Sequence, residues 1–460
     1  MTTRRELLSR IGGGFGLAGF ASTALANSAA PDPLAPKTPH FAPKAKRVIL
    51  LMLNGGLSQV DTFDPKPLLD KYHGKPFPGG NPTTERKTGS LMRSPFQFRK
   101  HGQSGIEVSE IFPRIGATID DYCVIRSMYT EVPNHEPSLY MMTCGTILKG
   151  KPSMGSWLCY GLGTENRNLP GFVVLCPENT TIGGAPQWSS GFLPAFYQGT
   201  LIKNTETAPE KIIPHIRNAK ISLDEQRQQV NLLEKLNRMH QTGREDNPQL
   251  EASIRAMEVA YRMQTEALGA FDLTKETAKT VNMYGEGDFA RGCLLARRLV
   301  ENGVRMVQLY FASRIVWDNH EDILLHRGLA QTADRAISAL IADLKSRAMF
   351  NDTLVIVATE FGRTPSVEIA PGLKVHNGRD HNPYGFTILL AGGGVKGGMT
   401  YGATDEFGYY STENKVHVHD LHATILHLMG LDHTRLTYRY SGRDFRLTDV
   451  HGNVVKSILA

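Results

Sequence analysis

The chain has few cysteines, and nothing in their spacing ties them together. Its 460 residues include five cysteines, none of them in C-x-x-C spacing, which excludes a zinc ribbon and a thioredoxin-like redox pair. Most stand in apolar stretches, so we expect them to be small buried hydrophobic residues. The five are Cys123, Cys144, Cys159, Cys176 and Cys293.

The chain also lacks a strong charge excess and long hydrophobic runs. Its formal net charge is +6, and no stripe of basic and aromatic residues accompanies it, so we predict no nucleic-acid partner. Beyond the N-terminus no segment is apolar enough to span a bilayer, so we predict no transmembrane segment in the mature chain. No internal repeat or boundary between two domains is evident. The 41% of hydrophobic residues suffices for a globular core.

The N-terminus has the composition of a targeting signal. Paired arginines, Arg4 and Arg5, precede a Gly/Ala-rich apolar stretch over 11–23, and Ala24-Leu25-Ala26 suits a signal peptidase. This pattern predicts a twin-arginine signal peptide over residues 1–26 and a periplasmic or secreted protein. An ordinary secretory signal or a retained membrane anchor is the alternative. Residues 27–46, rich in Pro, Ala and Lys, predict an extended linker.

The remaining residues, 47–460, predict one α/β domain. Short apolar runs alternate with helical patterns, which favours a mostly parallel, doubly wound sheet flanked by helices. A polar, helix-favouring stretch over 222–268 predicts a helical insertion. We expect strands at 47–53, 123–127, 171–176, 304–311, 353–359 and 386–391, and helices at 287–302, 328–348 and from Asp420, as N-cap, to about Met429.

Carboxylates and histidines stand where these strands begin or end. Asp318 and His320 follow one strand, Glu360 follows another, and Asp380 and His381 precede a third. Ligands collect at the carboxyl ends of strands in an open α/β sheet, so these side chains can meet. Carboxylate plus imidazole suits a borderline cation such as zinc or manganese, with calcium as a further candidate.

Several neighbouring residues offer alternative explanations. Glu321, Asp322 and His326 could replace the predicted ligands, and a solvated acidic loop would need no metal. Arg363 could bind an anion, or it could merely pair with Glu360.

Two further clusters carry candidate site residues. His135 and Pro137 mark a helix start, with Pro137 expected at the first helical position, where free backbone N–H groups can hold an anion. A capped core helix is the alternative. His417, His419 and His422 crowd a second helix start; we expect structural roles for at least two of them, and the third is a candidate to line the site.

The motifs resemble the exported, sulfatase-like bacterial proteins called domain of unknown function 1501, within the alkaline phosphatase and sulfatase superfamily. The resemblance covers residues 46–459. It is carried by the segments 53–56, 61–65, 132–135, 317–320, 360–364 and 380–382.

The resemblance implies an alkaline phosphatase-like fold and one metal site. It places Asn54 where the superfamily has its first metal-binding Asp, while Asp318, His320 and His381 match later ligands. His135 stands where sulfatases carry a modifiable Cys or Ser, so a formylglycine mechanism is excluded. The second metal site of the superfamily is in doubt.

These observations favour a metal-dependent hydrolase of an anionic ester, of the phosphoric or sulfuric ester class, acting on a small molecule or a polysaccharide. Asp318, His320, Asp380 and His381, with Asn54, would hold the ion. His135, Glu360 and Arg363 would be catalytic: His135 as nucleophile, unless water attacks, Glu360 as ligand or base, and Arg363 as anion binder. The alternatives are a catalytically inactive metal- or carbohydrate-binding envelope protein and a metal-independent structural protein.

Overall fold

The structure is a computed structural model. It describes residues 33–80, 84–178, 180–212 and 268–460, with scattered positions between 222 and 236. The predicted signal peptide and most of the predicted insertion, 222–268, lie outside the described residues.

A mixed, mostly parallel sheet forms the centre of the described chain. Its strand order is β13-β5-β12-β9-β1-β8-β6-β7, and β16 pairs with β5. Every pairing is parallel except those of β12, which runs antiparallel to both β5 and β9. The strands are β1 (Arg47–Met52), β5 (Tyr122–Tyr129), β6 (Phe172–Cys176), β7 (Thr200–Lys203), β8 (Met306–Tyr310), β9 (Thr353–Ala358), β12 (Phe386–Ala391), β13 (Met399–Tyr401) and β16 (Val416–His417).

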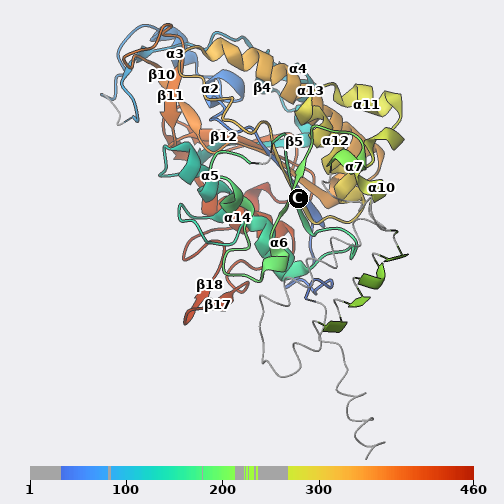
Figure 1. The fold of residues 1–460 in the computed structure, drawn as a ribbon. Helices are drawn as coiled ribbons and strands as arrows, with labels where there is room; N and C mark the ends of the chain where they lie inside the picture. The colour runs from blue at the N-terminus through green and yellow to red at the C-terminus, as the bar shows by residue number, and fades with distance from the viewer. Residues whose placement is uncertain are drawn as a thin grey trace, which may run out of the picture.

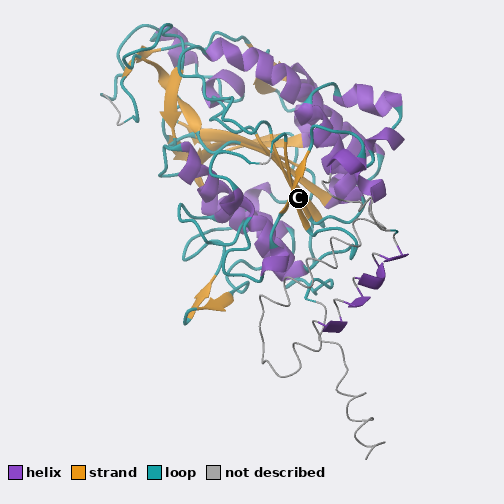
Figure 2. Cartoon of the chain, viewed as in Figure 1, coloured by secondary structure: helices purple, strands orange, loops and turns teal. Residues whose placement is uncertain are grey.

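Helices cover both faces of this sheet (Figures 1 and 2). One layer contains α4 (Pro113–Ala117), α11 (Ala278–Tyr284), α12 (Asp288–Glu301) and α13 (His326–Ser346); the other contains α5 (His135–Cys144), α6 (Met154–Leu162) and α14 (Val418–Leu428). The central strand β1 shows why two layers form. Ile49 and Leu51 pack in one core, whereas Val48 and Leu50 pack in the other, because successive side chains of a strand point to opposite faces.

The predicted strands and the two long predicted helices are confirmed, with ends shifted by at most two residues. The continuous apolar runs of these strands are typical of strands that are buried on both faces. The third predicted helix exists, but its predicted N-cap is wrong. His417 is the N-cap of α14, and Asp420 is the third residue of a capping box, where its carboxylate accepts the His417 backbone N–H at 3.0 Å.

A smaller sheet stands at one end of the central sheet. Its strands β2 (Thr88–Leu91), β10 (Gly362–Glu368) and β11 (Arg379–Asn382) pair antiparallel in the order β11-β10-β2. This sheet was not predicted, because β10 and β11 are rich in polar residues and lack an apolar run. The other described elements are short: α2 (Gln59–Thr62), α3 (Pro67–Lys71), α7 (Pro209–Ile212), α10 (Leu268–Phe271), β3 (Phe98–His101), β4 (Ile106–Ser109), β14 (Ala403–Thr404), β15 (Ser411–Glu413), β17 (Tyr438–Tyr440) and β18 (Arg443–Phe445), with several 3-10 turns.

The described part of the predicted linker, residues 33–46, has no helix or strand and lies against the domain. Backbone N–H groups of Lys44 and Ala45 donate to the carbonyl of Leu428 at 2.8 and 2.9 Å. All five cysteines are free and buried, as predicted.

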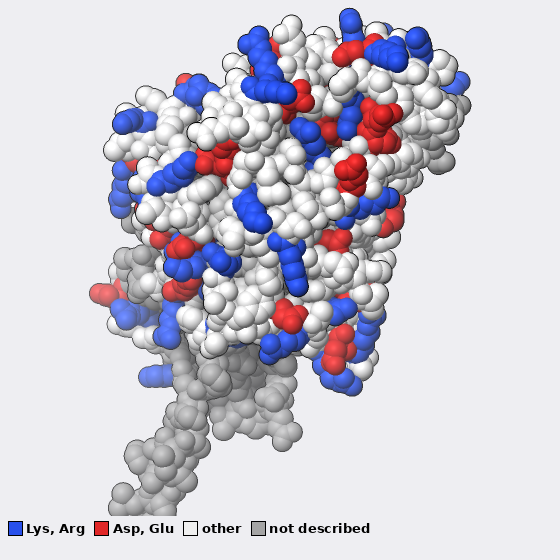
Figure 3. All heavy atoms as spheres, turned by 180° about the vertical axis from the view of Figure 1, so that it is seen from behind, with Lys and Arg blue, Asp and Glu red and all other residues white. Residues whose placement is uncertain are grey.

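The charged surface is mixed. On the face shown in Figure 3, Lys and Arg side chains are interspersed with Asp and Glu. Within the described residues, no helix combines the length and the apolar character needed to cross a membrane.

Candidate metal centre

The sheet topology brings the predicted site residues to one edge. Strands β5, β8 and β9 all run in the direction of β1, so the segments that follow them leave at the same edge. The segments after β8 and β9 carry Asp318, His320 and Glu360, and the segment after β5 leads to His135 at the start of α5. Because β12 is antiparallel, the segment before it arrives at this edge and brings His381. Four separate parts of the sequence therefore meet there: the three segments of the strand-end pattern and the helix start at His135.

One carboxylate oxygen, Asp318 Oδ1, lies at the middle of this cluster. It is 2.7 Å from His320 Nε2, 3.1 Å from His381 Nε2 and 3.2 Å from His135 Nε2. The Nε2 atoms of His320 and His381 are themselves 3.1 Å apart. Asp318 Oδ1 and these two nitrogens thus form a triangle whose sides are all about 3 Å long.

The other nitrogen of each imidazole ring is fixed by an acceptor. His135 Nδ1 lies 2.7 Å from Glu360 Oε1, and His381 Nδ1 lies 2.7 Å from the carbonyl of Pro133 and also against Glu85. His320 Nδ1 contacts the carboxylate of Glu368. These partners favour the tautomer that carries its proton on Nδ1, which leaves the Nε2 lone pairs directed into the cluster.

The cluster contains more buried acid than buried base among the described residues. Glu360, Glu368 and Asp380 are at most 1% exposed, whereas Arg363 is the one fully buried arginine that touches Asp318. Burial raises the pKa of the Asp380 carboxyl. Burial acts in the same direction on Asp318, but the imidazoles of His135, His320 and His381 next to its carboxylate and the charge of Arg363 hold its pKa far below the usual range. Buried anions need such cationic partners.

The histidines differ in their protonation. Burial lowers the pKa of His381 to about 3, because it outweighs the hydrogen bond to Asp318. Burial also opposes the charged forms of His135 and His320, but their hydrogen bonds to carboxylates raise both pKa values. His135 Nε2 is buried and has no partner with hydrogen-bond geometry among the described residues.

This donor set fits a divalent cation. Ligands at about 2.0–2.1 Å from an ion lie roughly 2.9–3.4 Å from each other in tetrahedral or octahedral sites, close to the sides of the triangle. Three overlapping residue groups also place their ligand atoms within 4.8 Å of one another. They are His135, Asp318 and His381; Glu85, Asp380 and His381; and His320, Glu368 and Asp380.

The sequence comparison places this architecture in a family. The model of the family described as "Protein of unknown function (DUF1501)" matches residues 45–459. The chain belongs to this family. The resemblance predicted from its motifs is thereby confirmed, and no curated protein matches the sequence.

Solved structures with a similar fold are distant from this DUF1501 protein. The lipoteichoic acid synthase LtaP from Listeria monocytogenes is 10% identical, with a TM-score of 0.38, over 90% of this chain and 78% of that chain. The alkaline phosphatase of the Antarctic bacterium TAB5 is 11% identical, with a TM-score of 0.36, over 85% and 99%. PsFucS1 sulfatase from Pseudoalteromonas sp. is 13% identical, with a TM-score of 0.34, over 84% and 68%. Likeness of this degree transfers no activity.

Asn54 contacts the loop after β8 in this DUF1501 protein. Its amide nitrogen donates to the carbonyls of Ala312 and Arg314 at 3.0 and 2.7 Å. Its side-chain nitrogen thus helps to hold the loop after β8, and metal binding by Asn54 stays a prediction. The neighbouring Gly55 N–H donates to Glu360 at 2.9 Å.

Arg363 is engaged within the protein. It is fully buried, and its guanidinium donates to the carbonyls of Gly55, Gly56 and Arg379 and to Asp318. It therefore pairs with Asp318. The simpler alternative from the sequence was a pair between Arg363 and Glu360, and the described contacts of Arg363 do not include Glu360. These contacts give it a positioning role, and anion binding by Arg363 stays a prediction.

The helix that begins at His135 starts two residues earlier than expected. Asn134 is the N-cap of α5, so Pro137 is its third residue and not its first. Proline is tolerated there because N–H groups of the first turn have no acceptor within the helix. The early start puts His135 itself at the N-terminus, next to Glu360.

Other candidates lie outside the centre. His326 is fully buried, with Nδ1 2.7 Å from Asn319 Oδ1, and Asp322 accepts the N–H of Leu324. His419 and His422 bond the carbonyls of Gly145 and Met142 at 2.8 Å, and His417 caps α14. None of these residues joins the described metal-binding groups, so the expectation that one of the three histidines lines the site is not supported.

Sequence reasoning missed two carboxylates. Glu368 is fully buried against His320, and Glu85 contacts His381. A signal for Glu368 existed, because a lone carboxylate between Val367 and Ile369 is expensive to bury without a partner. Glu85 stands in a polar segment that gives no such signal.

Proposed function

We propose that this protein is a metal-dependent hydrolase of an anionic ester. The observation that carries the proposal is the triangle of Asp318 Oδ1, His320 Nε2 and His381 Nε2, in which both imidazoles have their second nitrogen fixed by an acceptor. These three residues would hold the ion. Zinc and manganese suit a mixed imidazole and carboxylate set better than calcium, which prefers oxygen ligands. A bound divalent cation supplies Lewis acidity toward an ester oxygen and toward water.

His135 is the residue best placed to move a proton. Glu360 fixes its Nδ1, so Nε2, 3.2 Å from Asp318 and without a hydrogen-bond partner among the described residues, is the nitrogen that can exchange a proton with a substrate or with water. Ser138 is less suited to attack, because its hydroxyl donates to the carbonyl of Val132 at 2.6 Å. Water is therefore the attacking group in this proposal, without a covalent intermediate.

Glu360 and Arg363 position the reacting groups. Glu360 accepts the Gly55 N–H and orients His135, while Arg363 fixes the carboxylate of Asp318. We also propose that the chain is exported through its twin-arginine signal, which would deliver a folded protein, already loaded with metal, to a phosphorylated or sulfated ester outside the cytoplasm.

The test measures metal content and turnover together. Zinc- and manganese-loaded protein is assayed with aryl phosphate and aryl sulfate esters, alongside His381→Ala and His135→Gln. We expect His381→Ala to lose the metal and His135→Gln to keep it while losing turnover. His73→Ala, which alters an exposed histidine after α3, is the matched control and should behave as wild type. Absence of turnover by metal-loaded wild type on both ester classes would refute the proposal.

A further inference from the structure

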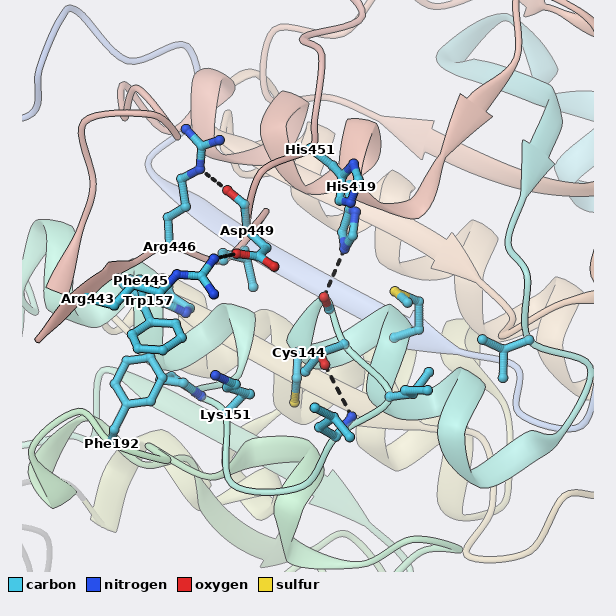
Figure 4. A pocket seen from close by; sticks show the side chains of 18 of the residues that line it. Cys144, Lys151, Trp157, Phe192, His419, Arg443, Phe445, Arg446, Asp449 and His451 are labelled. Atoms are coloured by element: carbon cyan, nitrogen blue, oxygen red, sulfur yellow. Dashed lines mark hydrogen bonds and ion pairs between the residues drawn. The ribbon is translucent and has the colours of Figure 1, made fainter. Parts of the chain in front are cut away.

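A second pocket lies at the opposite end of helix α5 from His135. Its volume is about 470 Å³, in the range of small-molecule sites. Cys144 and Gly145 at the end of α5 line it, together with residues of β18 and of the segment that follows it (Figure 4). Nine helical steps along α5 put Cys144 roughly 14 Å from His135, while Glu131 and Val132, before the start of α5, also line the pocket.

Cationic side chains line the pocket, and the acidic side chains beside them do not pair with all of them. Lys151, Arg443 and Arg446 line it, against the acids Asp449 and Glu131. Asp449 contacts Arg443 through its carboxylate. The ammonium of Lys151 has no hydrogen bond or ion pair among the described residues. It lies instead over two aromatic rings, 3.9 Å from the ring centre of Phe445 and 5.5 Å from that of Phe192. A half-buried ammonium held only by rings keeps three donors for an anion.

An apolar wall stands beside these cations. Phe192 and Phe445 line the pocket with their ring centres 5.0 Å apart, and Leu148 at its rim is 62% exposed. Phe192 is in turn stacked on Tyr440 at 5.1 Å. Such a surface suits the C–H face of a ring and not a free inorganic ion.

The far wall of the pocket is polar. His419 and His451 stack there with ring centres 5.1 Å apart. His419 is 6% exposed, and its Nδ1 is buried without a partner in the described part of the chain. The carboxylates of Glu131 and Asp449 are acceptors. Donors and acceptors on one side and an apolar face on the other match a ring that carries hydroxyl groups.

We infer that this pocket binds an acidic sugar residue, sulfated or carboxylated, of a carbohydrate chain. Lys151, Arg443 and Arg446 would hold the acidic group, Phe192 would pack against the sugar ring, and the exposed His451 would bond a hydroxyl group. The pocket is separate from the metal centre, and the inference does not depend on hydrolysis there.

The experiment is a calorimetric titration of the full chain with a sulfated hexosamine–uronate disaccharide, with maltose as the neutral probe and inorganic sulfate as the bare anion. We expect the acidic disaccharide to bind at least about tenfold more tightly than either of these. Lys151→Met keeps the side-chain length but removes the charge, and Phe192→Leu shortens the wall. Each should weaken binding about tenfold or more, as expected for a lost charged hydrogen bond or ring contact.

Lys279→Met makes the same change at an exposed lysine of α11 and should bind as wild type, as should His381→Ala, which alters only the metal centre. Equal affinity of wild type and Lys151→Met would overturn the inference, provided that both melt at the same temperature. Equal binding of inorganic sulfate and the disaccharide would also overturn it, because the apolar wall would then contribute nothing. Failure of ester hydrolysis leaves these outcomes unchanged, so the two proposals fail separately.

Discussion

The contact between Glu368 and His320 allows a sharp test of the metal centre. Glu368 is fully buried, one of its oxygens contacts His320 Nδ1, and the other lies 3.4 Å from the Arg86 guanidinium. In Glu368→Gln the amide oxygen can still accept from His320, but the negative charge that strengthens the imidazole as a ligand is gone. Loss of such an outer partner weakens metal binding about 10- to 100-fold, which corresponds to roughly 1.4–2.7 kcal/mol.

The assay is competition of the metal-free protein with a chromogenic chelator for zinc. Glu413→Gln, at an exposed glutamate of β15, is the control and should match wild type. The magnitude distinguishes two roles for Glu368. A loss well beyond 100-fold would mean that Glu368 is itself a ligand, and unchanged affinity would mean that His320 does not bind the ion. Either result would refute our reasoning.

Three further predictions concern stability and the loop at the site. In Gly55→Ala an added Cβ would lie 2.6 Å from the backbone N of Trp317, so a chelator titration should show weaker metal binding. Gly74→Ala is the control, because Gly74 also has a positive φ but has open space around it; this variant should keep the metal affinity of wild type. Burial lowers the pKa of His422 to about 3, so between pH 6.5 and 3 the unfolded chain binds a proton that the folded chain refuses. Stability should therefore fall with falling pH in this window, by up to about 4–5 kcal/mol from this residue, and urea unfolding of His422→Gln should show a shallower dependence. Leu51→Ala, at a fully buried position of β1, should reduce the free energy of unfolding by about 2–5 kcal/mol; a loss below 1 kcal/mol would contradict the packing described for the core.

The sequence predicts best those strands whose pattern has a single physical cause, namely burial on both faces. Strands β1, β8, β9 and β12 are buried on both faces, so each is a continuous apolar run whose ends are visible in the sequence. The direction of β12 was not visible, because an antiparallel strand in this position has the same composition. That direction explains why His381 precedes its strand, whereas Asp318 and Glu360 follow theirs.

The sequence predicts which residues belong to the site better than it predicts the role of each residue there. His135, His320, His381 and the His135 partner Glu360 could be proposed from their positions, but Glu368 and Glu85, which contact His320 and His381, come from segments that have no strand or helix pattern in the sequence. Asn54 shows a further difficulty. Its place matched a superfamily ligand, yet its amide serves backbone carbonyls of the loop after β8. Only the folded arrangement decides which of these polar groups face each other.

The most direct test of the metal centre is a crystal structure of protein purified with zinc or manganese, measured at the absorption edge of the metal. Our account predicts an anomalous peak about 2.0–2.3 Å from Asp318 Oδ1, His320 Nε2 and His381 Nε2, and loss of the peak in His381→Ala. A peak bound elsewhere, or none in well-ordered metal-loaded crystals, would contradict it.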